Sequence, residues 1–411
     1  MVPDTTTGTR ADTVQRGSLT VTVTAAGEAS QAIEALGAPG DRVPRAHVRI
    51  RHIGESPVEA GTTDSLGQVT FAELLPGRYD IASLRLLNSS EAMQVAVADS
   101  TLAGISAFGG GSRTQVQPPA SAVEVEAAAG HRGSLLISEI HDWSPRVTSG
   151  PSVQYGQAEY IEIYNNSDST IYLDGKILGD GFWYVWESSL NESSLDNCTE
   201  FESWRMDPDG VWSEKHLRFP GTGREYPLAP HEARVVASQA IDHGEVHPGL
   251  GLPDLSTADF EVVGTGQDVD NPAVPNMEHA GFRPSVDALG RGVVHVYFTP
   301  FIADNVDLES LPTDKLPLRD PDYRRFPAAT ILDLVAVYHD PATLDFDTRV
   351  CDHLVSPVFD RQAAPISDGL AGDAIHRHVL GETPDGHAIL QRTKTSAVDL
   401  VRGPRTPGRV P

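Results

Sequence analysis

Alternating apolar and polar positions dominate residues 135–179, which hold three apolar runs, Leu135–Ile140, Ala158–Tyr164 and Thr170–Leu178. The second run alternates with a period of two, and this predicts a half-buried strand. The Asn165–Asp168 cluster that follows it is rich in Asn, Ser and Asp and predicts a turn. We therefore expect three strands here.

The same pattern predicts short strands before and after this segment. They are Gly17–Ala25, Ala46–Ile53, Gln68–Phe71, Tyr79–Leu86, Gln94–Val97, Ala122–Ala127, Ala233–Ala237, Gly292–Phe298, Ile331–Tyr338, Ala374–Leu380 and Ala388–Arg392. The last two form a predicted hairpin with its turn at Asp385-Gly386. The glycine run within Phe108–Arg113 predicts a flexible loop, and Ala128–Gly133 predicts a joint between two domains.

Composition agrees with an all-β chain. The 411 residues include 30 Pro and 37 Gly, which favours many short strands joined by turns. A chain of this length has room for two or three domains with full cores. No window approaches the length of a membrane-spanning helix, and Met1–Gln15 is polar, lacks a secretory apolar region and is predicted to be disordered.

The N-terminal part resembles the carboxypeptidase-regulatory-like domain. The matching positions are Pro44–Val48, Thr62–Phe71 and Leu75–Tyr79, with the spacing Pro-x-Ala-x-Val, Thr-Thr-Asp-x-x-Gly-x-Val-x-Phe and Leu-Pro-Gly-x-Tyr. The resemblance implies a transthyretin-like sandwich without an active site. Gly67 also suits a tight hairpin, because glycine adopts positive φ at little cost.

The C-terminal part resembles a lamin-tail domain. Its opening matches Leu135–Gly175, and its late strand and exit match Ile331–Tyr338 and Ile389–Gly408. The resemblance implies an immunoglobulin-like sandwich with an interaction role, in which both ends of this region share one core. Glu139 and Glu162 occupy its acidic positions, where we expect them to satisfy turns or backbone donors.

Three further motifs lie at Gln239–His243, Leu255–Glu261 and Asp270–Met277. With these motifs, the whole layout resembles an uncharacterised family of Bacteroidota-type surface lipoproteins. It predicts two tandem β-sandwiches, immunoglobulin-like or transthyretin-like, after a disordered tail at 1–16. The first spans 17–130 and the second 131–411, with long loop-rich insertions at about 180–225, 241–290 and 303–326. The resemblance implies an extracytoplasmic protein, on the outer-membrane surface or secreted, although this sequence carries no lipoprotein signal.

The formal charge of −26, from 57 acidic and 31 basic residues, disfavours binding to nucleic acid and to anionic lipid. The two cysteines, Cys198 and Cys351, would close one long loop by a disulfide in an oxidising compartment, or remain as two thiols.

Aromatic residues gather in the first insertion. Trp183, Trp186, Trp204 and Trp212 lie within about thirty residues. One interpretation is a small satellite core that anchors the insertion. The other is a stacking platform for a sugar or another ligand with an apolar face.

Metal chemistry has several weak candidates. His376 and His378 would share one face of a strand, and His243 with His247 would do so only in a helix, which the nearby Pro and Gly disfavour. The acidic and amide side chains of Asp259, Glu261, Asp268, Asp270 and Asn271 could supply oxygen ligands to Ca²⁺ but do not match a regular Ca²⁺ loop. The alternative for each group is a set of solvated surface residues.

The sequence has no Gly-x-Ser-x-Gly motif, so it does not indicate a catalytic serine nucleophile. We therefore expect a non-catalytic cell-surface binding or adaptor protein, without a cofactor, whose ligand is a protein or a glycan. By analogy of layout, its partner would be an outer-membrane uptake complex. A metal-dependent hydrolase with its site on the insertions, or a structural spacer of a surface assembly, are the alternatives.

Overall fold

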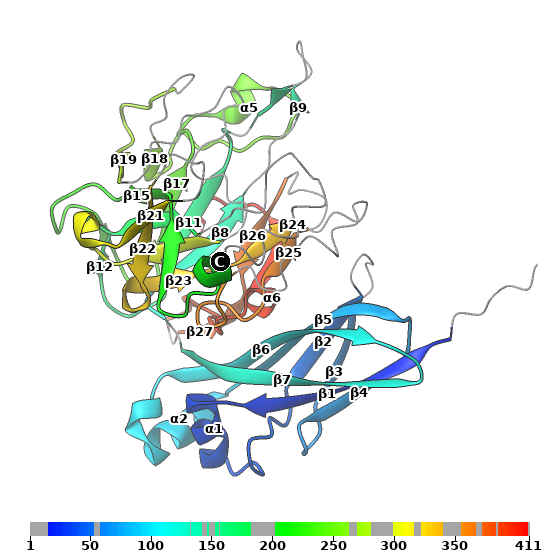
Figure 1. Ribbon diagram of the computed structural model, residues 1–411. Coiled ribbons are helices and arrows are strands. Elements are labelled where there is room, and N and C mark those ends of the chain that lie inside the picture. The colour runs from blue at the N-terminus through cyan, green and yellow to red at the C-terminus, as the bar shows by residue number, and fades with distance from the viewer. Residues whose placement is uncertain are drawn as a thin grey trace, which may run out of the picture.

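The chain is built mainly from strands, with a few short helices (Figure 1). The computed structural model describes residues 15–52, 58–131, 133–141, 146–147, 153–155, 157–181, 202–262, 269–280, 299–315, 322–339, 355–366, 372–383 and 385–409. The expected all-β fold of sandwich type is confirmed. In the described part of the chain, no helix is long and apolar enough to cross a membrane.

The N-terminal sheet has seven strands in the order β3-β2-β5-β6-β7-β1-β4. They are β1 (Gly17–Ala25), β2 (His47–His52), β3 (Val58–Thr62), β4 (Gln68–Leu74), β5 (Gly77–Leu86), β6 (Ile105–Val116) and β7 (Ala120–His131). Strand β7 pairs in parallel with β1 over Ala120–Ala127 and antiparallel with β6 over Ala128–His131. Because one strand serves both halves, the sheet folds into two layers around an apolar core.

Helices cover one end of this sheet. Helix α1 (Glu28–Ala35) buries Ala29, Ala32 and Ile33, and α2 (Ser89–Ala98) precedes a 3₁₀ turn, η1 (Ser100–Leu102). A strand was expected at Gln94–Val97, and that prediction is wrong. Asn88 and Glu91 form a capping box at the start of α2, and this start signal together with three alanines favours the helix.

One other expectation in this region is corrected. The glycine run of Phe108–Arg113 lies inside strand β6 and is not a loop. Small residues suggested a break there, but close packing of backbone on backbone also requires small residues. Strand β7 runs to His131, so most of Ala128–Gly133 is strand, and its role as a joint between two domains stays a prediction.

The C-terminal sheet has eleven strands in the order β23-β20-β13-β15-β19-β18-β17-β11-β8-β26-β29. They are β8 (Leu135–His141), β11 (Tyr160–Asn165), β13 (Ile177–Asp180), β15 (Lys215–Arg218), β17 (Ala233–Ala237), β18 (Phe260–Val262), β19 (Asn276–His279), β20 (Pro300–Ala303), β23 (Ile331–Leu334), β26 (Asp373–Arg377) and β29 (Leu400–Pro404). The backbone N–H of Ile137 in β8 donates to Asp333 in β23, so the sheet curls until its end approaches β8.

One core fills this curled sheet and includes Leu135, Leu178 and Leu400. The expectation that the two ends of the region share a core is therefore confirmed. Strand β11 is buried at all six positions, whereas the sequence predicted a half-buried strand. Its polar face is covered by the chain segment 405–408, which contacts Glu162 and its neighbour Glu139.

The predicted insertions contribute strands as well as loops. Strand β15 lies in the first insertion and β18 and β19 in the second, and all three belong to the C-terminal sheet. A satellite sheet is formed by β14 (Gly210–Ser213), β22 (Asp322–Pro327) and β21 (Thr313–Lys315). The predicted strand Gly292–Phe298 lies outside the described residues.

The remaining elements are short. The strand pairs are β9 (Arg146–Val147) with β10 (Val153–Gln154), β12 (Ile171–Tyr172) with β16 (Pro227–Leu228), β24 (Val337–His339) with β25 (Ala364–Ile366), and β27 (Val379–Glu382) with β28 (Ala388–Leu390). The helical turns are α4 (Glu202–Arg205), α5 (His243–Val246), α6 (Ser396–Asp399), η3 (Leu308–Ser310) and η4 (Ala328–Thr330).

Candidate functional site

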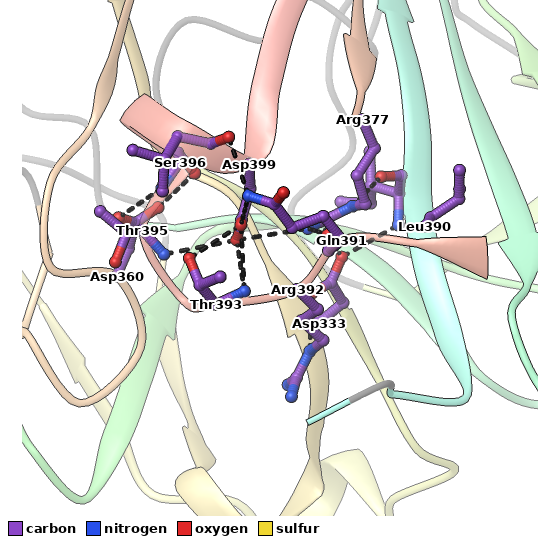
Figure 2. A network of polar contacts seen from close by, with 12 residues as sticks. Asp333, Asp360, Arg377, Leu390, Gln391, Arg392, Thr393, Thr395, Ser396 and Asp399 are labelled. Carbon is purple, nitrogen blue, oxygen red and sulfur yellow. Dashed lines mark hydrogen bonds and ion pairs between the residues drawn. The ribbon is translucent and has the colours of Figure 1, made fainter. Parts of the chain in front are cut away.

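A buried polar network surrounds the loop Gln391–Asp399, which joins β28 to β29 (Figure 2). Its centre is Arg377 at the end of β26, whose side chain is 1% exposed. Arg377 Nη2 lies 2.6 Å from Asp333 Oδ2, and Nη1 lies 3.7 Å from Asp399 Oδ2. Arg377 also donates to the carbonyls of Ile137 and Gln391, so this buried cation is surrounded by acceptors.

Asp399 holds the loop closed. Its carboxylate accepts from the backbone N–H and the hydroxyl of Thr393, each at 2.8 Å, and from the Gln391 amide at 3.0 Å. Burial raises the pKa of Asp399, while Arg377 and these donors lower it. A carboxylate with this many donors is a structural anchor for the residues around it.

A second acid, Asp360, holds the other end of the loop. It accepts from the Ser396 hydroxyl, from the Ser396 N–H at 3.1 Å and from the Ala336 N–H at 3.0 Å. Burial raises the pKa of Asp360 to about 7, against the lowering effect of these hydrogen bonds. Ser396 is 2% exposed and donates to an acid, so a substrate cannot reach it as a nucleophile.

The outer side of this loop faces the N-terminal sheet. Arg49 in β2 donates through Nη2 to the Ala397 carbonyl at 2.8 Å. A Cβ atom built on Gly109 of β6 would lie 2.5 Å from Thr393 Cβ, and one on Gly130 of β7 would lie 2.6 Å from the Arg392 carbonyl oxygen. The network therefore positions a loop that packs directly on glycine backbone.

A second group of buried acids lies under the segment 405–408. Glu139 accepts from the Thr406 N–H and hydroxyl, both at 2.8 Å, and Glu162 accepts from the Gly408 N–H at 2.9 Å. Tyr160 donates to Glu139 as well. Burial, with a smaller contribution from the nearby Glu139, raises the pKa of Glu162 to about 8. As expected from the sequence, both acids satisfy backbone donors.

The structure places two of the four candidate tryptophans. Trp204 of α4 stacks on Trp212 of β14, with ring centroids 4.5 Å apart and planes at 8°, and both side chains are half-buried. Trp204 also contacts the buried ring of Tyr323 in β22. This geometry anchors α4 on the satellite sheet. Trp183 and Trp186 lie outside the described residues.

A salt bridge supports this aromatic pair. Trp212 Nε1 donates to Asp207 at 3.1 Å, and Arg325 of β22 donates to both oxygens of Asp207, at 2.5 and 2.8 Å. Arg325 lowers the pKa of Asp207. Half-buried indoles held by a rigid ion pair form a surface that a ligand with an apolar face could contact.

The predicted metal residues have other partners. His376 Nδ1 lies 3.5 Å from Glu139, whereas His378 lies near Arg49 and Asp399, where burial and then Arg49 lower its pKa. Asp259 accepts from the Val235 N–H. No group of three metal-ligating side chains converges in the part of the chain that the structure describes.

The other predicted positions have mixed outcomes. Asp270 accepts from the Asn276 amide, and Asp268 lies outside the described residues. The helix α5 at His243–Val246 corrects the expectation that Pro and Gly exclude one, and the rings of His243 and His247 both contact Tyr155. Cys198 and Cys351 lie outside the described residues, so the disulfide stays a prediction.

The network around Arg377 was missed by sequence reasoning, although a signal was present. Asp333, Arg377 and Asp399 each stand within or next to a segment that the sequence pattern predicts to be a strand. A charged residue inside a strand that is buried on both faces needs a buried partner. Opposite charges in three such runs could have been paired on that ground.

No family model matches the sequence, and no curated protein matches it. Among solved structures, the chain is similar to a DUF4876 family protein from Bacteroides thetaiotaomicron, with a TM-score of 0.50 and 17% identity over 96% of this chain and 98% of that one. This likeness shows a shared fold. The major pilin SpaD from Corynebacterium diphtheriae aligns over 42% of this chain and 44% of its own length, at 11% identity and a TM-score of 0.20.

Proposed function

We propose that this chain is a non-catalytic, extracytoplasmic protein that binds a protein or a glycan as an adaptor at the cell surface. The observation that carries the proposal is that its buried acids are inaccessible and are already hydrogen-bonded within the chain. Asp333, Asp360, Asp399, Glu139 and Glu162 are each at most 3% exposed and accept hydrogen bonds from the chain itself. They stabilise loops, and none is open to a substrate.

The organisation of the fold supports the same proposal. The two curled sheets have separate apolar cores, which fits the proposed division into units 17–130 and 131–411. The similarity in fold to a DUF4876 protein from Bacteroides is compatible with the proposed Bacteroidota-type surface family. The carboxypeptidase-regulatory-like and lamin-tail assignments, the outer-membrane or secreted location and the uptake complex as partner remain parts of this proposal.

The proposed contact surface is the region of Trp204 and Trp212. Binding sites commonly use aromatic rings with a few well-placed polar groups, and Asp207 with Arg325 provides such groups beside the indole pair. The net charge of −26 favours partners that are neutral or basic at this surface.

The test is a binding screen run beside a turnover screen. Purified protein is applied to an array of neutral and acidic oligosaccharides and assayed with ester, amide, glycoside and phosphodiester substrates. We expect saturable binding of one ligand class that Trp212→Ala weakens, without turnover. Hydrolysis that a single substitution such as His376→Ala abolishes would overturn the proposal and favour the hydrolase alternative.

A further inference from the structure

Three consecutive glycines lie in the middle of strand β6, at Gly109, Gly110 and Gly111. Glycine weakens a strand, because it offers no side chain to pack and loses the most backbone freedom on folding. A run of three inside a paired strand therefore requires a compensating contact. Close approach of another backbone or side chain is the usual physical reason.

That approach comes from the C-terminal unit. A Cβ on Gly109 would lie 2.5 Å from Thr393 Cβ, and a Cβ on Gly111 would lie 2.5 Å from Gln362 Cβ. A Cβ on Gly110 would instead meet the backbone of Glu126 and Ala127 in the neighbouring strand β7. Thus the first and third glycines leave room for residues of the C-terminal unit, and the second leaves room for the neighbouring strand of its own sheet.

We call the surface formed by Gly109 and Gly111 the glycine seat, and two further contacts extend it. Gly130 of β7 leaves room for the backbone of Arg392 and Thr393, and Arg49 of β2 donates to the Ala397 carbonyl. Arg49 is half-buried, so this hydrogen bond forms in a partly desolvated environment, and the same burial lowers the pKa of Arg49. Helix α6 also lies beside β5, as seen where the two units meet in Figure 1. Strands β2, β5, β6 and β7 all take part.

The partner of this seat is itself held rigidly. Thr393 is bound to Asp399, Ser396 is bound to Asp360, and Gln362 follows Asp360 and donates its N–H to that acid at 2.9 Å. The residues that touch the glycines are therefore fixed by the buried acids of Figure 2. Because the glycine-containing strand and the fixed loop pack so closely, the two units can adopt few orientations relative to each other.

We propose that the loop Gln391–Asp399, together with Gln362, is a clasp that locks the two units into one rigid body at a fixed angle. The glycine seat on β6 and β7 is its binding surface, and the partner is this same chain. The inference goes beyond the proposed function and does not depend on any ligand. It implies that binding surfaces on the two units keep a constant separation.

Small-angle scattering of the full-length protein tests the clasp. We expect wild-type data to fit one arrangement of the two units, and Gly109→Val to increase the radius of gyration and broaden the distance distribution, because the added side chain collides with Thr393. Gly381→Val is the matched control: it is also a strand glycine, but nothing lies within 4 Å of its added Cβ, so the scattering should not change.

A second variant covers the case in which Gly109→Val does not fold. Arg49→Met removes the hydrogen bond to Ala397 without adding bulk, and we expect a smaller shift in the same direction. Wild-type scattering that requires many arrangements of the two units would overturn the proposal. So would folded Gly109→Val and Arg49→Met variants with unchanged scattering.

Discussion

Glu139 and Glu162 lie directly opposite each other on β8 and β11, and both carboxylates are buried. Two carboxylates in this position would repel each other, so the buried pair needs hydrogen-bond donors or a bound proton to offset the repulsion. Donors from Ser138, Tyr160, Thr406 and Gly408 provide it, and the raised pKa of Glu162 means that it keeps its proton near neutral pH. The same acids hold the segment 405–408 on the sheet.

The first prediction concerns pH. The folded-state pKa of Glu162, about 8, lies above the ordinary value of 4.5, so the folded form binds the proton more tightly. Its contribution to stability is complete below pH 4.5 and is lost as the pH rises to 8 and above. We expect the free energy of unfolding of Glu162→Gln at pH 9 to exceed that of wild type by on the order of 3–5 kcal/mol.

The control for this experiment is Glu382→Gln, at an exposed position in β27. Denaturant unfolding followed from pH 5 to pH 9 should give parallel curves for the control and wild type. The curve for Glu162→Gln should be flatter. If all three proteins lose stability with the same slope, Glu162 is not the titrating group.

The second prediction concerns the buried cation. Arg377→Met leaves Asp333 and Asp399 without their main positive partner, and removal of one member of a buried ion pair costs about 3–5 kcal/mol. Arg402→Ala, which removes the exposed pair with Asp373, should cost less than about 1 kcal/mol. Equal losses in the free energy of unfolding would show that the Arg377 network contributes no more than a surface salt bridge.

The third prediction concerns Ser396 and Asp360. Ser396→Ala removes a donor from a buried acid, which should cost about 1–3 kcal/mol in stability. The Ser396 hydrogen bond lowers the pKa of Asp360, so its loss should raise that pKa above about 7. A carboxyl ¹³C NMR titration measures the shift directly. An unchanged titration midpoint would contradict the assigned hydrogen bond.

The fourth prediction concerns the indole pair. Stacked indole rings with centroids 4.5 Å apart should couple through their strong far-ultraviolet transitions and give a couplet, a pair of circular dichroism bands of opposite sign. We expect Trp204→Phe to remove this couplet, while an unchanged denaturant unfolding midpoint shows that the variant is still folded. A couplet that persists in Trp204→Phe would show that the described pair is not its source.

How far the sequence predicts this structure depends on the range of the interactions. Strands such as Gly17–Ala25 and Ala233–Ala237 follow from local alternation, and both were predicted with their observed bounds. Gly109 and Gly111 of β6 were misread because the residues that approach them, Thr393 and Gln362, lie about 250 residues or more away along the chain. Likewise, the sequence marks Asp333 and Arg377 as charges inside predicted strands, but only the curled sheet shows that they lie next to each other.

The central claim is that the polar network around Gln391–Asp399 is a fixed structural element of the folded chain. Amide hydrogen exchange of Thr393, Ser396 and Ala336, whose N–H groups donate to Asp399 and Asp360, tests it most directly. The account predicts that these three amides exchange only through global unfolding, at the rate of core amides such as Ile137. Exchange at the rate of an open loop, with the core still protected, would contradict it.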